Sequence, residues 1–249
     1  MNMHGLGVDI GGSGVRVALV DTTTGALIGQ PAMHDHTLET PAETILATLV
    51  ETIGQFPESL PVGVGFPGVV EQTVVNTAPN LRSTWPGTDL AEALQRPSLV
   101  ALNDADAAAV AEHRLGASRG ENGTVLTITV GTGLGTALHR NHVLVPNLEF
   151  GLMPHPTLGG MIEDHASGRA KTIEGLSLVQ WASRFQDVLS LYEVWLCPDL
   201  IVIGGGITGQ WEALAPLLST RAELRRAKFG PHAGLIGAAL MGTSKVGDA

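Results

Sequence analysis

Short runs of apolar and β-branched residues, separated by glycine, dominate the first thirty residues of the chain. Residues 6–10 and 15–20 are apolar runs on either side of the glycine-rich segment 11–14, and residues 26–30 follow a second turn-like segment. Runs of this kind bounded by glycine are typical of strands joined by tight turns. The pattern predicts a strand, a glycine-rich turn, a strand, a turn and a third strand.

The same plan returns about 120 residues later. Residues 124–130 are rich in β-branched side chains, the glycine-rich segment 131–135 follows, and residues 136–139 and 143–145 continue as short apolar runs. A repeated supersecondary pattern indicates two similar halves, and we expect them to face a shared cleft. We therefore predict an N-terminal α/β lobe over residues 1–103 and a C-terminal α/β lobe over residues 104–249.

Helical periodicity appears between the predicted strands. Residues 40–56 begin with Thr40 as a candidate cap, Pro41 at the first helical position and Glu43 completing a capping box. Further strands are predicted at 62–70, 98–102 and 199–203, and further helices at 106–115, 170–196, 211–218 and 234–240. This alternation predicts an α/β fold.

The composition argues against several classes of protein. Hydrophobic residues make up 44% of the 249 residues, which is enough for a large core, and the formal net charge of −10 argues against a broad nucleic-acid surface. The single cysteine, Cys197, excludes an internal disulfide and fits a reducing compartment. No apolar run approaches the length of a membrane span, and no signal-peptide pattern is seen. We expect a cytoplasmic protein that binds neither nucleic acid nor a membrane.

The two glycine-rich turns are the first candidate site. Glycine lets the backbone approach an anion and direct N–H groups at it, and Ser13 and Thr132 add hydroxyl donors. Two such turns, one in each half, would clamp a phosphate chain from both sides. The alternative is a pair of tight hairpins without a ligand. A third glycine cluster, 204–206, follows a predicted strand, and either a nucleotide contact or a plain strand-to-helix turn explains it.

Acidic residues near strand ends are the second candidate site. Asp9 ends the first strand, where its carboxylate would hold Mg²⁺ or instead accept hydrogen bonds from nearby turn amides. Asn103 and Asp104 follow another strand, so they would be catalytic residues or a helix N-cap. Asp104 and Asp106 together are a weaker candidate metal pair.

In combination these segments resemble the ROK family of sugar kinases, within the actin/hexokinase superfamily, and most of all its polyphosphate glucokinases. The resemblance covers about residues 5–241 and is carried by Asp9-Ile10-Gly11-Gly12-Ser13-Gly14-Val15-Arg16, Gly65-Phe66-Pro67-Gly68, Asn76-Thr77-Ala78-Pro79-Asn80, Val130-Gly131-Thr132-Gly133-Leu134-Gly135 and Leu144-Val145-Pro146-Asn147-Leu148-Glu149. It implies a duplicated actin/hexokinase-like (ribonuclease H-like) fold with two lobes around a cleft.

 

The resemblance also implies roles for particular residues. Asp104 would be the general base that accepts the proton of the attacking sugar hydroxyl, and Asp9 would support Mg²⁺. The sugar would be bound by the backbone of Gly65 and by Asn80, Asn103 and Glu149. The phosphates would be held by Gly11, Gly12, Ser13, Gly131, Thr132 and Gly133, with Gly205 near the adenosine or its equivalent position. The donor would be ATP or polyphosphate, the acceptor a glucose-like hexose, and the assembly a homodimer.

One departure from the family bears on the sugar. The family usually reads Glu-x-Gly-His, whereas here Glu149-Phe150-Gly151 is followed by Leu152, and no carboxylate follows nearby. Leucine cannot hydrogen-bond a hydroxyl, and the loss of such a partner changes discrimination strongly. We expect His155 to substitute in part, or the sugar to differ.

Two further alternatives concern the donor and the activity. Arg221, Arg225, Arg226 and Lys228 form the densest basic cluster, which would be a polyphosphate track or, as we favour, a solvated helix face. An impaired, ROK-like sugar-binding or sensor protein is the alternative to an active kinase. A repressor is disfavoured, because only eight residues precede Asp9 and leave no room for a DNA-binding module.

Overall fold

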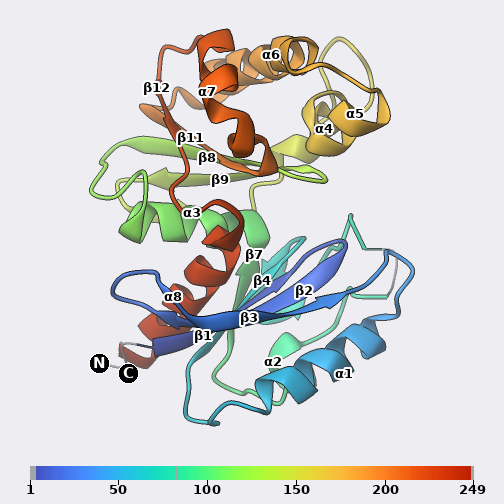
Figure 1. Cartoon of the computed structure of the whole chain (residues 1–249), viewed down its shortest axis with the longest axis vertical. Helices are drawn as coiled ribbons and strands as arrows, with labels where there is room; N and C mark the ends of the chain where they lie inside the picture. Colours follow the sequence, from blue (N-terminus) through green and yellow to red (C-terminus); the bar gives the residue numbers. More distant parts are fainter. Residues whose placement is uncertain (1–3, 82–83, 248–249) are drawn as a thin grey trace. The chain divides into compact units, whose positions relative to one another are not determined.

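The computed structural model describes residues 4–81 and 84–247, which form two compact units (Figure 1). The first unit comprises residues 1–115 together with the C-terminal residues 232–249, and the second comprises residues 116–231. Helices α3 (Asp104–Leu115) and α8 (Ala233–Gly247) thus belong to the first unit. This division differs from the sequence-based boundary after residue 103, because the chain returns to the first unit at its end.

A five-stranded mixed sheet forms the centre of the first unit. Strands β1, β2 and β3 are an antiparallel meander, and β4 and β7 continue the sheet beside β1 in parallel. The order is β3-β2-β1-β4-β7, with bounds Leu27–Asp35, Gly14–Asp21, His4–Ile10, Val62–Phe66 and Val100–Asn103. A small hairpin of β5 (Val70–Glu71) and β6 (Val74–Val75) lies outside this sheet.

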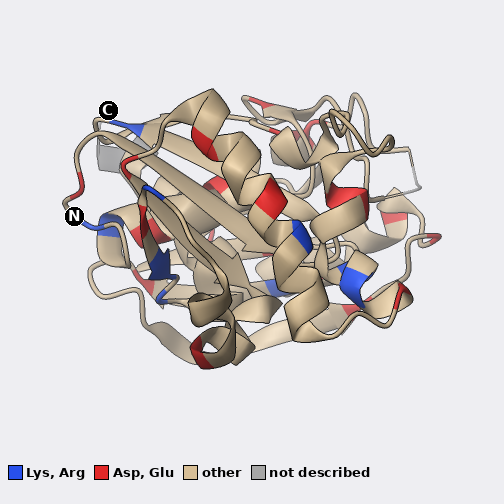
Figure 2. Ribbon diagram, turned by 90° about the horizontal axis from the view of Figure 1, so that it is seen from above, with Lys and Arg blue, Asp and Glu red and all other residues tan. Residues whose placement is uncertain are grey.

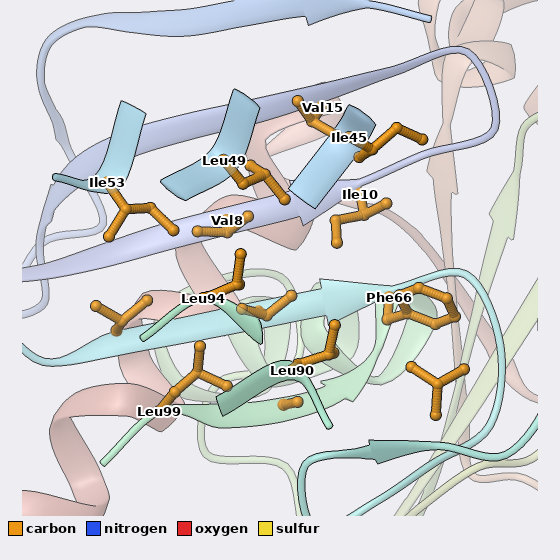
Figure 3. Close-up of a cluster of buried hydrophobic side chains, with 14 of the residues drawn as sticks. Val8, Ile10, Val15, Ile45, Leu49, Ile53, Phe66, Leu90, Leu94 and Leu99 are labelled. Atoms are coloured by element: carbon orange, nitrogen blue, oxygen red, sulfur yellow. The ribbon is translucent and has the colours of Figure 1, made fainter. Parts of the chain in front are cut away.

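One face of this sheet carries the apolar core. Side chains alternate along a strand, so Leu6, Val8 and Ile10 of β1 point to the same side, and all three are completely buried. Helices α1 (Ala42–Ile53) and α2 (Leu90–Ala93) pack there, and Figure 3 shows their side chains meeting those of the strands. This burial explains the helical spacing of apolar residues in the sequence.

The opposite face is lined with glycine where the helices approach. A Cβ atom on Gly7 would overlap the carbonyl oxygen of Leu235, and one on Gly63 would overlap that of Ala238. Helix α8 therefore packs with its backbone directly on β1 and β4. Gly237 of α8 makes the same kind of approach to the carbonyl oxygen of Ala107 in α3.

The start of α1 differs from the sequence-based expectation. Pro41, not Thr40, is the N-cap residue, and no side chain caps the helix. The Thr40 hydroxyl oxygen instead accepts a hydrogen bond from the backbone N–H of Thr37 at 3.0 Å. The predicted capping box is therefore wrong: the turn before the helix competes for the threonine hydroxyl.

The second unit repeats the sheet of the first. Its strands β8, β9 and β10 are an antiparallel meander, and β11 and β12 follow in parallel beside β8. The order is β10-β9-β8-β11-β12, with bounds Val143–Val145, Leu134–Arg140, Thr124–Val130, Leu200–Gly205 and Glu223–Arg226. The two sheets share one topology, so the repeat of pattern read from the sequence is confirmed.

The second sheet is accompanied by several short helices and one long helix. These are α4 (Ile162–Ala166), α5 (Gly168–Ile173), α6 (Leu178–Leu196) and α7 (Trp211–Leu214). Single 3₁₀ turns lie at Phe150–Leu152, Gly206–Gln210 and Ala215–Leu217 in this unit, and at Gly230–His232. The long helix predicted over 170–196 is thus divided: α5 ends before Gly175, whose φ of 62° favours glycine, and Ser177 caps α6.

The basic cluster at the end of the second unit is a strand rather than a helix. Residues Glu223–Arg226 form β12 at the edge of the sheet, so the predicted helix face is wrong. Figure 2 shows the basic residues as separate short blue segments on a mostly tan ribbon. Within the described part of the chain, every helix is too short or too polar to span a bilayer.

The glycine face makes a prediction about stability. Replacing Gly7 with Ala would drive a methyl group into the backbone of α8, and overpacking of this kind costs about 1–3 kcal/mol. Gly209→Ala is the control, because a Cβ there meets no atom within 4 Å. Chemical denaturation should show a lower free energy of unfolding for Gly7→Ala only; equal stability of the two variants would contradict the packing.

Candidate active site

Three parallel strands of the first unit end at the same edge of the sheet and bring the predicted acidic residues together. Asp9 of β1 is paired with Gly65 of β4, and Phe66 of β4 is paired with Asn103 of β7. A Cβ atom on Gly65 would lie 3.6 Å from the Asp104 Cα atom and 3.8 Å from Asp9 Oδ1. Ligands of α/β proteins bind at the carboxyl ends of such strands.

Asn103 and Asp104 have different local roles. The Asn103 side-chain oxygen accepts hydrogen bonds from the backbone N–H groups of Ala105 (2.8 Å) and Asp106 (3.1 Å), so Asn103 caps α3. Its side-chain nitrogen donates to the carbonyl oxygen of Gly68 at 3.2 Å. Asp104 is the half-buried first residue of α3, and its Oδ1 accepts the N–H of Ala105 at 2.7 Å. The cap interpretation is therefore correct for Asn103, and Asp104 is held beside Gly65.

Asp9 lies on the glycine face of the sheet and has a cationic partner. Its Oδ2 accepts a hydrogen bond from Arg16 Nη2 at 2.5 Å, directly across the antiparallel pair of β1 and β2. Burial raises the pKa of Asp9, while the charge and hydrogen bond of Arg16 lower it. A Cβ atom on Gly234, in the first turn of α8, would lie only 3.0 Å from Asp9 Oδ1. Arg16 is a contributor to this site that sequence reasoning did not single out.

The Asp9 carboxylate is suited to hold a magnesium ion only through a water molecule. One oxygen is occupied by Arg16, and the other is the oxygen beside Gly65 and Gly234. No group of three His, Cys, Asp or Glu residues suited to a metal occurs among the described residues, and Asp106 is completely buried. Mg²⁺ keeps several waters and takes few protein ligands, so a single carboxylate acting through water is compatible with such an ion.

The first glycine-rich turn is a tight hairpin with an exposed tip. The N–H of Gly11 donates to the carbonyl oxygen of Gly14 at 2.9 Å, and Ser13 is exposed. A Cβ atom on Gly12 would lie 3.4 Å from the carbonyl oxygen of Asn80, so the predicted sugar-binding segment lies against this turn. The N–H of His36 donates to the Ser13 carbonyl oxygen at 3.1 Å and holds the hairpin from the side of β3.

The second glycine-rich turn has the same character in the second unit. The N–H of Gly131 donates to the carbonyl oxygen of Gly133 at 3.1 Å, while Gly131 and Thr132 are exposed. Gly205 has a φ of 81° and is paired with Val130, and a Cβ atom on it would overlap the Val130 carbonyl oxygen. The structure thus brings Gly205 to the base of this turn, and no other residue type fits there.

Glu149 is held near the same turn by a threonine. The Thr136 hydroxyl donates to the carbonyl oxygen of Leu148 at 2.6 Å and accepts the N–H of Phe150 at 3.0 Å. A Cβ atom on Gly151 would overlap the carbonyl oxygen of Leu134, so the 3₁₀ turn after Glu149 packs on the start of β9. Sequence reasoning missed Thr136, because its role depends on partners twelve and fourteen residues away.

His155 lies in a loop that its own ring stabilises. Its Nδ1 accepts hydrogen bonds from the backbone N–H groups of Thr157 (3.3 Å) and Leu158 (3.1 Å), and its ring contacts that of His165 edge-on with centroids 4.9 Å apart. Burial lowers the pKa of His155, the neighbouring His165 lowers it further, and Asp187 opposes both. The neutral ring therefore carries its proton on Nε2 and can donate from that atom.

Glu163 is a buried carboxylate that the sequence analysis did not find. It lies in α4, and its Oε2 accepts the N–H of Leu134 at 3.0 Å. Its side chain is only 7% exposed. The search for a carboxylate soon after Leu152 missed it because ten residues intervene, and only the folded loop returns the chain to the turn.

The arginines of the basic cluster are largely engaged within the second unit. Arg225 binds Glu223 through two hydrogen bonds of 2.7 Å and Glu121 through one of 2.8 Å. Arg221 donates to the carbonyl oxygen of Glu193 at 2.9 Å. These contacts engage Arg221 and Arg225 within the unit, while Arg226 is exposed on β12.

Comparison with known proteins fits this arrangement. Residues 5–149 match the model of the ROK family. The chain is 38% identical to the polyphosphate glucokinase of Mycobacterium tuberculosis (strain CDC 1551 / Oshkosh) over 250 residues, which cover 95% of this chain and 90% of that protein. It is 37% identical to the polyphosphate glucokinase of Mycobacterium leprae (strain TN), over 98% of this chain and 76% of the relative.

Solved structures agree in fold. The crystal structure of the inorganic polyphosphate/ATP-glucomannokinase from Arthrobacter sp. strain KM matches with a TM-score of 0.88 and 34% identity, over 98% of this chain and 100% of that chain. A ROK family glucokinase from Streptomyces griseus matches in fold with a TM-score of 0.79 and 23% identity, over 97% of this chain and 99% of that chain. The predicted α/β, actin/hexokinase-like fold is confirmed.

The fold and these relatives together define a sugar kinase of the hexokinase type. The chain belongs to the ROK family.

The Thr136 clamp makes a prediction about stability. Thr136→Val removes the hydroxyl and leaves the Phe150 N–H without its acceptor, which costs about 1–3 kcal/mol. Thr127→Val is the matched control, because Thr127 is equally buried in the neighbouring strand β8 and its hydroxyl has no partner among the described residues. Denaturant titration should separate the two variants; similar losses in both would contradict the clamp.

The His155 loop makes a prediction about pH. Because the pKa of His155 is lower in the folded protein than its ordinary value of 6.5, the unfolded chain binds the proton more readily. The stability from this group is therefore present above pH 6.5 and is lost as the pH falls toward the folded-state pKa.

His155→Asn keeps an acceptor near the Nδ1 position but does not titrate. The slope of unfolding free energy against pH, measured between about pH 5 and 7, should be smaller in this variant than in the wild type. His4→Asn, at an exposed position at the start of β1, is the control. An unchanged slope in His155→Asn would contradict the prediction.

Proposed function

We propose that the protein transfers a phosphoryl group from polyphosphate or ATP to a hydroxyl of a glucose-like hexose, with Asp104 as the general base. The observation that carries the proposal is the placement of Asp104 beside Gly65 and Asp9, at the carboxyl ends of three parallel strands. The names of the relatives support the donors and the class of sugar.

In the proposed reaction the sugar hydroxyl oxygen attacks the terminal phosphorus of the donor. The bond from that phosphorus to the donor's bridging oxygen breaks, and the hydroxyl proton passes to the Asp104 carboxylate. Asn103 keeps Asp104 in place by capping α3 and by holding the Gly68 carbonyl. Phosphoryl transfer depends mainly on positioning and on electrostatic stabilisation, so this local rigidity is part of the catalysis.

The two glycine-rich turns are the proposed phosphate sites. Gly11, Gly12 and Ser13 form one, Gly131, Thr132 and Gly133 form the other, and Gly205 supports the second from below. The N–H groups of Gly11 and Gly131 close their own turns, and the other N–H groups of the two turns would stabilise charge on the phosphates. When bound, Mg²⁺ would neutralise charge on the transferred group, and Asp9 would hold it through water.

For the sugar we propose Asn80, Asn103, Glu149, His155 and the Gly65 backbone. Thr136 directs the segment that carries Glu149. The Nε2–H of His155 would donate to a sugar hydroxyl in the role that Leu152 cannot fill, since Nδ1 is already occupied by two backbone N–H groups. A donor of this kind would discriminate among hexoses by the orientation of one hydroxyl.

We also propose a homodimer and a cytoplasmic location. The family resemblance supports the dimer, and the single cysteine is compatible with a reducing compartment. Light scattering after size-exclusion chromatography should give twice the chain mass of 25.9 kDa. A mass of one chain at micromolar concentration would contradict the dimer.

The test of function is a phosphorylation assay that crosses two donors with several sugars. ATP and polyphosphate are each combined with glucose, mannose, fructose, glucosamine and N-acetyl amino sugars, and the sugar phosphate is measured directly. Phosphorylation of a glucose-like hexose with at least one donor is the expected result. Failure with every pair would contradict the proposed function.

Asp104→Ala tests the general base. Proton transfer by a positioned side chain contributes about 10²–10⁴-fold to the rate, so turnover should fall by about that factor while sugar affinity, measured by calorimetry, stays within about threefold. Glu51→Ala, at an exposed position of α1, is the control and should keep full turnover. Turnover close to that of the wild type in Asp104→Ala would rule out this role.

A further inference from the structure

The second glycine-rich turn is held at both ends by one short segment, residues 163–169. At the C-terminal end of the turn, Glu163 Oε2 accepts the N–H of Leu134 at 3.0 Å. At the N-terminal end of the turn, the N–H of Gly168 donates to the carbonyl oxygen of Gly131 at 2.9 Å. A Cβ atom on Gly168 would lie 2.6 Å from that oxygen, so the two backbones are in direct contact. The segment therefore lies along the turn.

Arg169 is the next residue, and its guanidinium group lies near the same turn. Its Nη2 is 3.8 Å from Glu163 Oε1, while the other oxygen of that carboxylate bonds the Leu134 N–H. Charge-assisted hydrogen bonds are about 2.7–2.9 Å long, so this ion pair is loose. The Arg169 side chain is 42% exposed. It therefore keeps donors available for another anion.

Two other arginines of the second unit, Arg184 and Arg225, are more firmly engaged. Arg184 binds Glu174 through two hydrogen bonds of 2.8 and 2.7 Å, and Arg225 binds Glu121 and Glu223. Residues 131–135 contain no lysine or arginine. Neither glycine-rich segment has the lysine of a P-loop. Arg169 is thus the loosely paired guanidinium that the fold attaches to this turn.

We propose that Arg169 binds the phosphoryl donor. This proposal rests on the proposed function. In it, the guanidinium group of Arg169 pairs with the non-bridging oxygens of a phosphate held at residues 131–135. A planar guanidinium matches phosphate geometry, and the shared chemistry applies to a nucleotide phosphate and to inorganic polyphosphate. Glu163 is the positioning residue, since it contacts both the turn and Arg169.

Kinetics of Arg169→Gln and Arg169→Lys test the inference. Hydrogen bonds to charged groups are worth about 1.5–3 kcal/mol, so the donor KM should rise about 10- to 100-fold in Arg169→Gln. The sugar KM should change by less than about threefold, and Arg169→Lys should be intermediate. Arg184→Gln is the matched control, because it removes a paired arginine of the same unit. A rise with only one donor would assign Arg169 to that donor.

Direct binding separates this inference from the proposed function. Affinities for ATP and for polyphosphate are measured by calorimetry on the wild type and each variant, and they require no turnover. Weaker binding in Arg169→Gln supports the inference even where no sugar is phosphorylated, an outcome that would contradict the proposed function alone. Unchanged donor affinity and KM in a folded Arg169→Gln would overturn the inference. If that variant does not fold, unchanged values in Arg169→Lys would overturn it.

Discussion

The close approach of α8 to the glycine face of the first sheet is the constraint on which the acidic site depends. Gly7 and Gly63 let the helix backbone touch the strands, because any Cβ atom there would overlap the helix carbonyl oxygens. The first turn of α8 consequently reaches Asp9 through Gly234. The same absence of side chains at Gly65 allows Asp104 to lie beside Asp9. Backbone packing, rather than a salt-bridge network, brings the two carboxylates to one edge.

The second unit uses glycine for a related purpose but places it around the second glycine-rich turn, residues 131–135. Gly205, Gly151 and Gly168 each contact a backbone atom of residues 130–134. Thr136 and Glu163 add hydrogen bonds from the sides. A turn with exposed amides would otherwise be mobile, and these contacts hold its N–H groups in a fixed array before any ligand arrives.

The proposed function requires an acidic chain to bind a polyanion by local contacts. The net charge of −10 repels phosphates at long range, and Arg225, Arg221 and Arg184 are engaged with acidic residues or carbonyls of their own unit. In the proposed function the contacts to the phosphates are short-range, and they come from the turn amides and the loosely paired Arg169.

The sequence alone determined the strands, the two glycine-rich turns and the duplicated plan, because alternation and turn chemistry are local properties of the chain. It also indicated Asp9, Asn103 and Asp104 as candidates, through their positions at strand ends. Which of Asn103 and Asp104 caps α3 could not be read from the sequence, since both residue types cap helices equally well. The hydrogen bonds that Asn103 Oδ1 accepts from the backbone N–H groups of Ala105 and Asp106 settle that assignment.

Only the tertiary structure decided the remainder. Thr40 bonds a local turn instead of capping α1, β12 formed where a helix was expected, and Glu163 returned to the second turn after an irregular loop. The last two outcomes depend on a distant partner: a neighbouring strand for β12, and for Glu163 a turn to which the loop brings it back. Periodicity reports which face of an element is apolar, and it carries no information about which distant element will cover it.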